Sequence, residues 1–144
     1  MLRPFPDPGV LPTKPKPKRG EKIVLRVPGL PPYKDVKFSI RNIKHRHNER
    51  FVRLRQEAIK AMAGRAWSQG AIRMRLTVFA PAFEKGKALI DYAAGVEDTL
   101  DGSHGDTFTY LPTAFQDDCQ VCGSGSYFRR SKKTHYIVEV TFLD

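Results

Sequence analysis

Residues 71–80 read AIRMRLTVFA, and this stretch sets the fold class. Its apolar positions alternate with polar or bulkier ones, so that Ile72, Met74, Leu76 and Val78 share one face. A period of two residues predicts a β-strand with one buried face. Pro81 closes the strand. We therefore expect a sheet that is covered on one side.

The segments around this strand have regular periods of their own. Lys22–Val27 predicts a strand that ends at Pro28-Gly29. From Glu49 a helix is predicted that stops at Gly64. Its apolar face carries Phe51, Leu54, Ala58, Ala61 and Met62, and we place Arg50, Arg53, Arg55 and Lys60 around the rest of its surface.

The second half of the chain predicts one helix and two strands. Apolar residues recur with helical spacing from Leu89 to Leu100, before Asp101-Gly102, and residues 103–115 read as a long loop. Strands are expected from Asp118 to Phe128 and from His135 to Leu143. The order strand, helix, strand, helix, strand, strand predicts an α+β fold, a small mixed β-sheet with helices packed mainly on one face.

Composition predicts one domain preceded by an arm. The chain has 144 residues, of which 40% are hydrophobic, enough for a single core. Residues 1–20 are basic and proline-rich, which favours a flexible arm before a domain at 21–144. No apolar run approaches the ~20 residues of a membrane span, and no secretion signal is visible. With only two cysteines, we expect a cytoplasmic protein without a membrane partner.

Charge is distributed unevenly along the chain, whose formal net charge is +10. Residues 34–60 hold nine Lys or Arg against three acids, whereas residues 84–118 hold eight acids against two lysines. Basic flanks around an acidic pocket suit a polyanion bound with a divalent cation, and nucleic acid is such a partner. The candidate DNA contacts are Lys44, Arg46, Arg50, Arg53, Lys85 and Lys87. The alternative interpretation is a solvated basic face with acidic, solubilising loops.

Aspartates are the candidate catalytic groups. Asp91 and Asp98 are seven residues apart, which places them on one helix face with Cα atoms about 10 Å apart. Because Mg²⁺ takes one or two carboxylates plus water and phosphate, one helix carboxylate could join the Asp117-Asp118 pair. On a strand only one member of that pair would face the site, and we choose Asp118, with Asp117 in support. The alternative is that these residues are polar helix ends and turns.

The same residues carry a resemblance to a known family. Asp98-Thr99-Leu100-Asp101-Gly102, followed by Asp117-Asp118-Cys119-Gln120-Val121, resembles the RusA family of Holliday junction resolvases. Val27-Pro28-Gly29-Leu30-Pro31-Pro32 is similar to that family's first strand and proline turn, so the likeness covers residues 22–142. It implies a RusA-like fold and a homodimer that cuts branched DNA with Mg²⁺, or with Mn²⁺ in its place.

The resemblance implies that Asp118 and Asp91 hold the metal, with Asp117 and Asp98 beside them. Here the chain also departs from the family. Only one of two expected aspartates opens the helix, Asp91 is one place off, and Ala94-Gly95 replaces an expected lysine. Lys85 or Lys87 is a candidate to replace that charge, and Glu84 to replace the lost carboxylate.

Two functions follow from this sequence. The first is a magnesium-dependent endodeoxyribonuclease that acts on Holliday junctions or other branched DNA. The alternative is a catalytically weakened RusA-like protein that binds nucleic acid without cutting it. No glycine-rich phosphate loop is present, so we expect no nucleotide cofactor.

Overall fold

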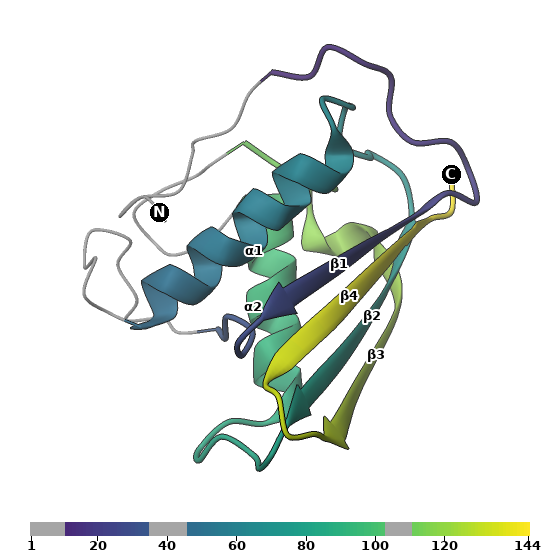
Figure 1. The fold of residues 1–144 in the computed structure, drawn as a ribbon. Helices are drawn as coiled ribbons and strands as arrows, with labels where there is room; N and C mark the ends of the chain where they lie inside the picture. The colour runs from purple at the N-terminus through teal and green to yellow at the C-terminus, as the bar shows by residue number, and fades with distance from the viewer. Residues whose placement is uncertain (1–10, 35–45, 103–110) are drawn as a thin grey trace.

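The computed structural model describes residues 11–34, 46–102 and 111–144, with the backbone alone at 46–48 (Figure 1). The chain runs through β1 (Lys22–Pro28), α1 (Arg46–Met62), β2 (Ile72–Ala80), α2 (Leu89–Asp101), the 3₁₀ turn η1 (Asp118–Gln120), β3 (Val121–Arg130) and β4 (His135–Phe142). The prediction of an α+β fold is confirmed as a four-stranded mixed sheet with two helices. Of the predicted long loop, residues 103–110 lie outside the described residues, as do residues 1–10 of the arm.

The sheet has the strand order β1-β4-β2-β3. β4 is antiparallel to both of its neighbours, whereas β2 and β3 are parallel. Parallel neighbours need a crossover connection, and α2 supplies it. Because α2 runs back along the sheet, its C-terminal part lies at the end of the sheet where η1 leads into β3. This arrangement positions the candidate site.

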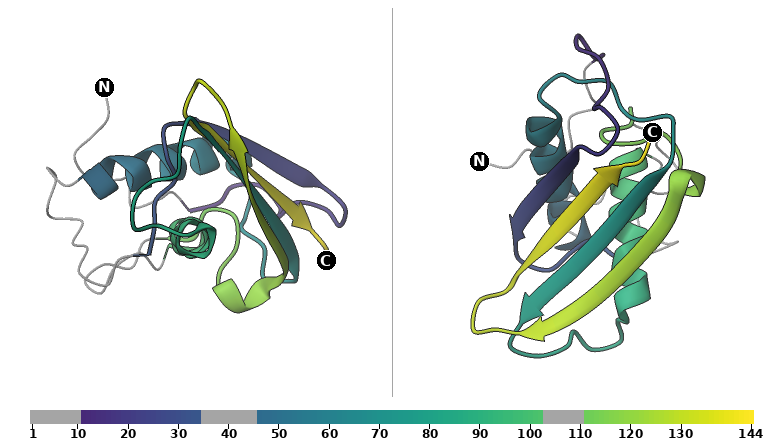
Figure 2. Two further views of the ribbon diagram at one scale, coloured as in Figure 1. Left: turned by 90° about the horizontal axis from the view of Figure 1, so that it is seen from below. Right: turned by 90° about the vertical axis from the view of Figure 1, so that its right-hand side faces the viewer.

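Both helices cover one face of the sheet, and the other face has no helix over it in the described parts of the chain (Figure 2). The alternation predicted for β2 is confirmed, because Ile72, Met74, Leu76 and Val78 are fully buried. They pack with Leu54 and other apolar residues of the helices. Burial of this apolar surface is the main term that holds the two layers together.

The placement of Arg55 on the polar side of the first helix is wrong. Arg55 is completely buried. The reason lies in the helical period, since position 55 follows Phe51 by four residues and precedes Ala58 by three, and both are buried. α1 also begins at Arg46, three residues before the predicted start.

The predicted start of the third strand at Asp118 is also wrong, because β3 begins at Val121. Residues 118–120 instead form η1, which begins after Asp117. The Asp117 carboxylate accepts a hydrogen bond from the Cys119 N–H at 3.0 Å, and such a side-chain cap favours a turn over an extended strand.

The second half of the expected arm lies against the domain. The N–H groups of Thr13 and Lys14 both donate to the Gly64 carbonyl oxygen at 3.0 Å, just beyond the end of α1. Neither helix, within the segments described, has the length and apolarity that a membrane crossing requires.

Candidate metal centre

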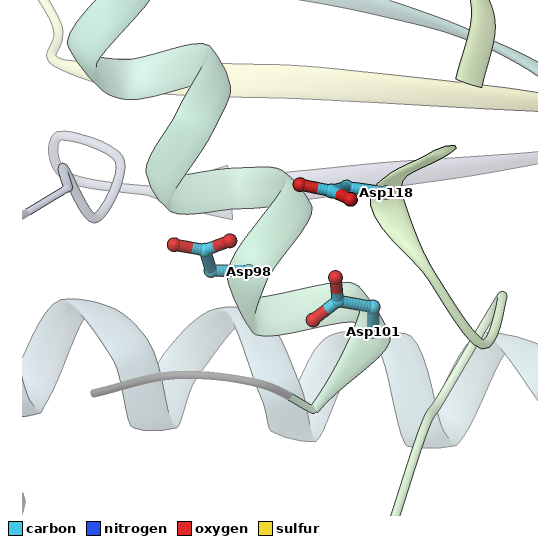
Figure 3. A group of neighbouring side chains, drawn as sticks. All are labelled: Asp98, Asp101 and Asp118. Carbon is cyan, nitrogen blue, oxygen red and sulfur yellow. The ribbon is translucent and has the colours of Figure 1, made fainter. Parts of the chain in front are cut away.

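Three carboxylates from two elements meet at one end of the sheet. Asp98 and Asp101 belong to the last turns of α2, and Asp118 opens η1 (Figure 3). One carboxylate oxygen from each lies within 4.8 Å of the other two. Asp101 is buried, Asp98 is half-buried and Asp118 is exposed, so the cluster opens to solvent on the Asp118 side. We call these three residues the acidic cluster.

The end of α2 sets two of the three candidate ligands. Asp98 and Asp101 are three residues apart, which places them on one helix face. Gly102 ends the helix in the left-handed conformation, with φ of 82°, a value that glycine adopts without strain. The N–H groups of Thr113 and Ala114 donate to the Leu100 carbonyl oxygen. The returning chain is therefore fastened to the helix end.

Gly95 lets α2 approach the turn that follows β1. A Cβ atom at position 95 would lie 2.4 Å from the Pro32 carbonyl oxygen and 2.6 Å from the Tyr33 Cα. No other residue fits such a contact without movement of the backbone. Ala94-Gly95 stands where the resemblance leads one to expect a lysine, and the structure gives Gly95 a packing role there.

Gln120 anchors η1 and thereby Asp118. Its side-chain Nε2 donates to the carbonyl oxygens of Ser68 and Gly70, at 2.9 and 2.7 Å. Its Oε1 accepts from the N–H groups of Gln116 and Asp117, at 2.9 and 2.8 Å. One side chain therefore joins the segment before β2 to the turn that carries Asp118. The glutamine of the Asp-Asp-x-Gln-Val motif has a structural explanation in these contacts.

The surroundings of the acidic cluster disfavour negative charge. Burial, and then the charges of Asp118, Asp98 and Asp101, raise the pKa of Glu97 to about 7. Burial also raises the pKa of Asp98, and the positive charge of Lys34 opposes this rise. The last turn of α2 holds no basic residue, although a helix C-terminus carries partial negative charge. A bound cation would relieve this repulsion.

The donor set fits a hard divalent cation. Carboxylate oxygens are the ligands that Mg²⁺ prefers, and octahedral bonds of about 2.1 Å put ligand atoms about 3–4 Å apart. Separations within 4.8 Å are close to that spacing, so modest side-chain rotation suffices for a shared ion. Water and a phosphate oxygen would fill the remaining positions. The cluster can therefore bring a metal ion and a phosphodiester together.

The structure brings together two of the predicted aspartates, Asp98 and Asp118, but not the others. Asp91 lies in the first turn of α2, where its carboxylate accepts from the Ala88 N–H at 2.8 Å. Asp117 caps η1, and its hydrogen bond from the Cys119 backbone lowers its pKa. Neither belongs to the acidic cluster.

Glu84, considered as a substitute carboxylate, is held elsewhere. It forms a two-point ion pair with Arg50, at 2.9 and 2.6 Å, and accepts from the Tyr92 hydroxyl at 2.6 Å. Both members of the ion pair are largely buried, with side chains 14% and 9% exposed. The predicted DNA contact Arg50 thus joins α1 to the segment before α2, and this ion pair occupies the guanidinium.

Three of the other predicted DNA contacts, Arg53, Lys85 and Lys87, are among the described side chains. Arg53 is paired with Glu49 one helical turn away, at 2.8 Å. Lys85 is exposed in the turn before α2, and the Lys87 ammonium lies 3.7 Å from the centre of the Tyr33 ring. Lys44 and the side chain of Arg46 lie outside the described residues.

The sequence analysis does not select Asp101, Glu97 or Lys34 as candidate site residues. Asp101 could have been found from its spacing, because it lies three residues after Asp98 and therefore on the same face of the helix. No pattern in the sequence indicates that the charge of Lys34 lowers the pKa of Asp98, because the two residues are distant in the chain and interact through space. Glu97 adjoins Asp98, but its raised pKa depends on burial and on the charge of Asp118. Among the residues that the structure describes, Lys34, and not Lys85 or Lys87, is the cation whose charge reaches Asp98.

Comparison with known proteins gives no relative: the chain matches no family model, and no curated protein has a recognisably similar sequence. Function is therefore inferred from the geometry of the site and from the motifs.

Proposed function

We propose that this protein is a magnesium-dependent endodeoxyribonuclease of the RusA type that cuts Holliday junctions or other branched DNA. The observation that carries the proposal is the acidic cluster, in which Asp98, Asp101 and Asp118 come from two separate elements and lie within 4.8 Å of one another. Two aspartates at a helix C-terminus, without a basic residue in the last turn, destabilise that end of the helix. A cation bound between them would offset this destabilisation.

The residues of the cluster have distinct roles in this proposal. Asp98 and Asp101 would hold the ion from the helix side, and the exposed Asp118 would hold it on the side that faces solvent. Bound Mg²⁺ would activate a water molecule and stabilise the leaving oxygen during attack on phosphorus. Lys34 supplies positive charge near Asp98 and offsets part of the repulsion between the protein carboxylates and phosphate.

The branched-DNA substrate and the homodimer are proposed because the sequence motifs resemble those of the RusA family. The motif residues Asp98, Asp118 and Gln120 occur in the family's order, and two of them are in the acidic cluster while the third anchors it. A dimer would present two such clusters, one for each of two symmetrically related strands. The net charge of +10 supplies the attraction for DNA phosphates.

A second candidate is a RusA-like protein that binds nucleic acid without cutting it. One observation favours it: Asp91, the aspartate nearest to the family's helix-opening pair, caps the start of α2 and does not join the cluster. On that alternative the acidic cluster would be a remnant that holds no catalytic ion.

The experiment is a junction cleavage assay with the purified full chain, with Mg²⁺ and with EDTA. Asp98→Asn, Asp101→Asn and Asp118→Asn should each reduce cleavage by about 100-fold or more, because each removes a metal ligand. Junction affinity in EDTA should stay equal or improve, since a negative charge facing phosphate is removed. Glu57→Gln, which removes one negative charge from α1, is the matched control and should cut normally.

Asp91→Asn separates the two possible ligand sets. We expect it to retain cleavage within a few-fold, since its carboxylate serves the helix start. Strong loss in this variant, with normal cleavage by Asp101→Asn, would overturn the ligand assignment. Tight junction binding by the wild type without cleavage in saturating Mg²⁺ would reject the nuclease and favour the second candidate.

A further inference from the structure

Basic side chains gather on the face of the sheet that no described helix covers. The outward positions of β1, β2 and β3 supply five basic side chains: Lys22, Arg26, Arg73, Arg75 and Arg129. Figure 2 shows this face toward the viewer in its right-hand view, with both helices behind the sheet. We call it the open face. It contains none of the residues of the acidic cluster.

Acidic side chains at the outward positions of the four described strands do not balance this charge. Glu139 is the one acid on the outward positions of the four strands, and it lies between Lys22 at 3.3 Å and Arg75 at 4.0 Å. Five cations against one carboxylate leave an excess of four positive charges on one side of a thin sheet. A folded protein that keeps such a surface largely free of counter-charges attracts polyanions to it.

The open face also presents flat groups at its β3 edge. The Arg75 guanidinium lies over the Tyr127 ring, 4.8 Å from its centre, and Tyr127 is 47% exposed. Glycines lie beneath these side chains. A Cβ at Gly125 would be 3.1 Å from the Tyr127 ring, and one at Gly123 would be 3.5 Å from Arg73. The glycines let the long side chains lie flat across the strand.

A second stacked pair lies further along the same face. Phe79 of β2 and His135 of β4 are parallel, with ring centres 4.4 Å apart and planes 4° apart. Rings and guanidinium planes on a basic sheet are the groups on which unpaired bases stack. A duplex keeps its bases stacked on one another, so its base faces are not available to such groups.

We propose that the open face binds a single strand of nucleic acid, with phosphates on Arg73 and Arg75 and bases on the rings. Such binding is additional to the nuclease activity and does not depend on it. The acidic cluster is formed by the last turns of α2 and by η1, and none of its residues belongs to the open face, so binding to the open face requires no metal.

The test is fluorescence anisotropy with a labelled oligothymidylate of about 20 nucleotides, in EDTA so that no strand is cut. An oligouridylate and a duplex of equal length are run in parallel. The double variant R73Q/R75Q should reduce the slope of log affinity against log salt by about 1.4, since each contact to a single strand contributes about 0.7. That slope corresponds to an affinity about 25-fold lower at about 0.1 M salt.

Two further variants separate stacking from charge. Tyr127→Leu should lower oligothymidylate affinity about fivefold or more, with an unchanged salt slope, because it removes a ring and no charge. K14Q/K16Q is the matched control: it removes two exposed positive charges beside the end of α1 and should leave the slope unchanged. Melting temperatures check that each variant is folded.

Several results would overturn the proposal. If R73Q/R75Q and K14Q/K16Q lose the same amount of oligothymidylate affinity, the binding depends on the net charge of the protein and not on the open face. Tighter binding of the duplex than of either single strand would reject single-strand recognition. If sedimentation shows that R73Q/R75Q changes the oligomeric state while oligonucleotide affinity stays normal, the open face is a contact between copies of the chain. Similar affinities for oligothymidylate and oligouridylate would support a binding mode that single-stranded DNA and RNA share. These outcomes do not depend on whether the protein cleaves junctions.

Discussion

Replacement of Glu97 by glutamine should stabilise the metal-free protein at alkaline pH. The carboxyl lies beside the acidic cluster, and burial with neighbouring negative charge raises its pKa from 4.5 to about 7. A rise of this size corresponds to at most about 3 kcal/mol of destabilisation of the ionised form. Because Glu97 is partly exposed, we expect solvent screening to reduce the effect to about 1–2 kcal/mol.

The dependence on pH identifies the cause. Below about pH 4.5 the carboxyl is protonated in both the folded and the unfolded chain, so its charge contributes nothing. Between 4.5 and about 7 the folded state retains a proton that the unfolded state releases, so this group makes stability fall as the pH rises. Above about 7 the wild type bears the full effect and Glu97→Gln does not.

The assay is urea unfolding of wild type and Glu97→Gln at about pH 5 and about pH 8, with and without Mg²⁺. The variant should gain most at the higher pH in EDTA, and Mg²⁺ should shrink the difference because a cation offsets the repulsion. Glu57→Gln is the matched control. A gain that is equal at both pH values, or a variant less stable than wild type at the higher pH, would refute this account of the cluster.

Two other substitutions test how the cluster is held in place. Gly95→Ala should cost about 1–3 kcal/mol of unfolding free energy, because the added Cβ would lie 2.4 Å from the Pro32 carbonyl oxygen; urea unfolding measures it, and wild-type stability would contradict the close contact. Gln120→Leu removes four hydrogen bonds and should cost about 2–4 kcal/mol. It should also weaken Mn²⁺ binding at Asp118 in a calorimetric titration, and unchanged affinity would show that Asp118 does not need this anchor.

Periodicity alone was sufficient for most of the secondary structure. The alternation of residues 71–80 predicted β2, and the helical spacing from Leu89 to Leu100 predicted α2 with its stop at Gly102. Both are local signals, because burial on one face repeats every two residues in a strand and every three to four in a helix. Arg55 marks the limit of this reasoning, since its chemistry suggested the surface and its helical position placed it in the core.

Motif residues were visible in the sequence, but the contacts that hold them in place were not. Asp98 and Asp118 were identified as site candidates, yet they belong to separate elements, α2 and η1, and only the crossover brings these together. The sequence shows Gln120 as part of a motif, whereas its hydrogen bonds to Ser68 and Gly70 join segments that are distant in the chain. Such contacts leave no periodic signal, because they depend on where the elements pack.

The α+β class, the approximate extent of most elements and the acidic segment within a basic chain could all be predicted from the order of the residues. Which carboxylates meet depends on how the elements pack in three dimensions. The cluster contains Asp101, and not Asp91 as the sequence led us to expect, because the C-terminal end of α2 lies beside the turn that leads into β3. Asp91 lies at the other end of the helix. Distances between side chains on different elements depend on topology and packing, and neither is encoded in the spacing of residues along one helix.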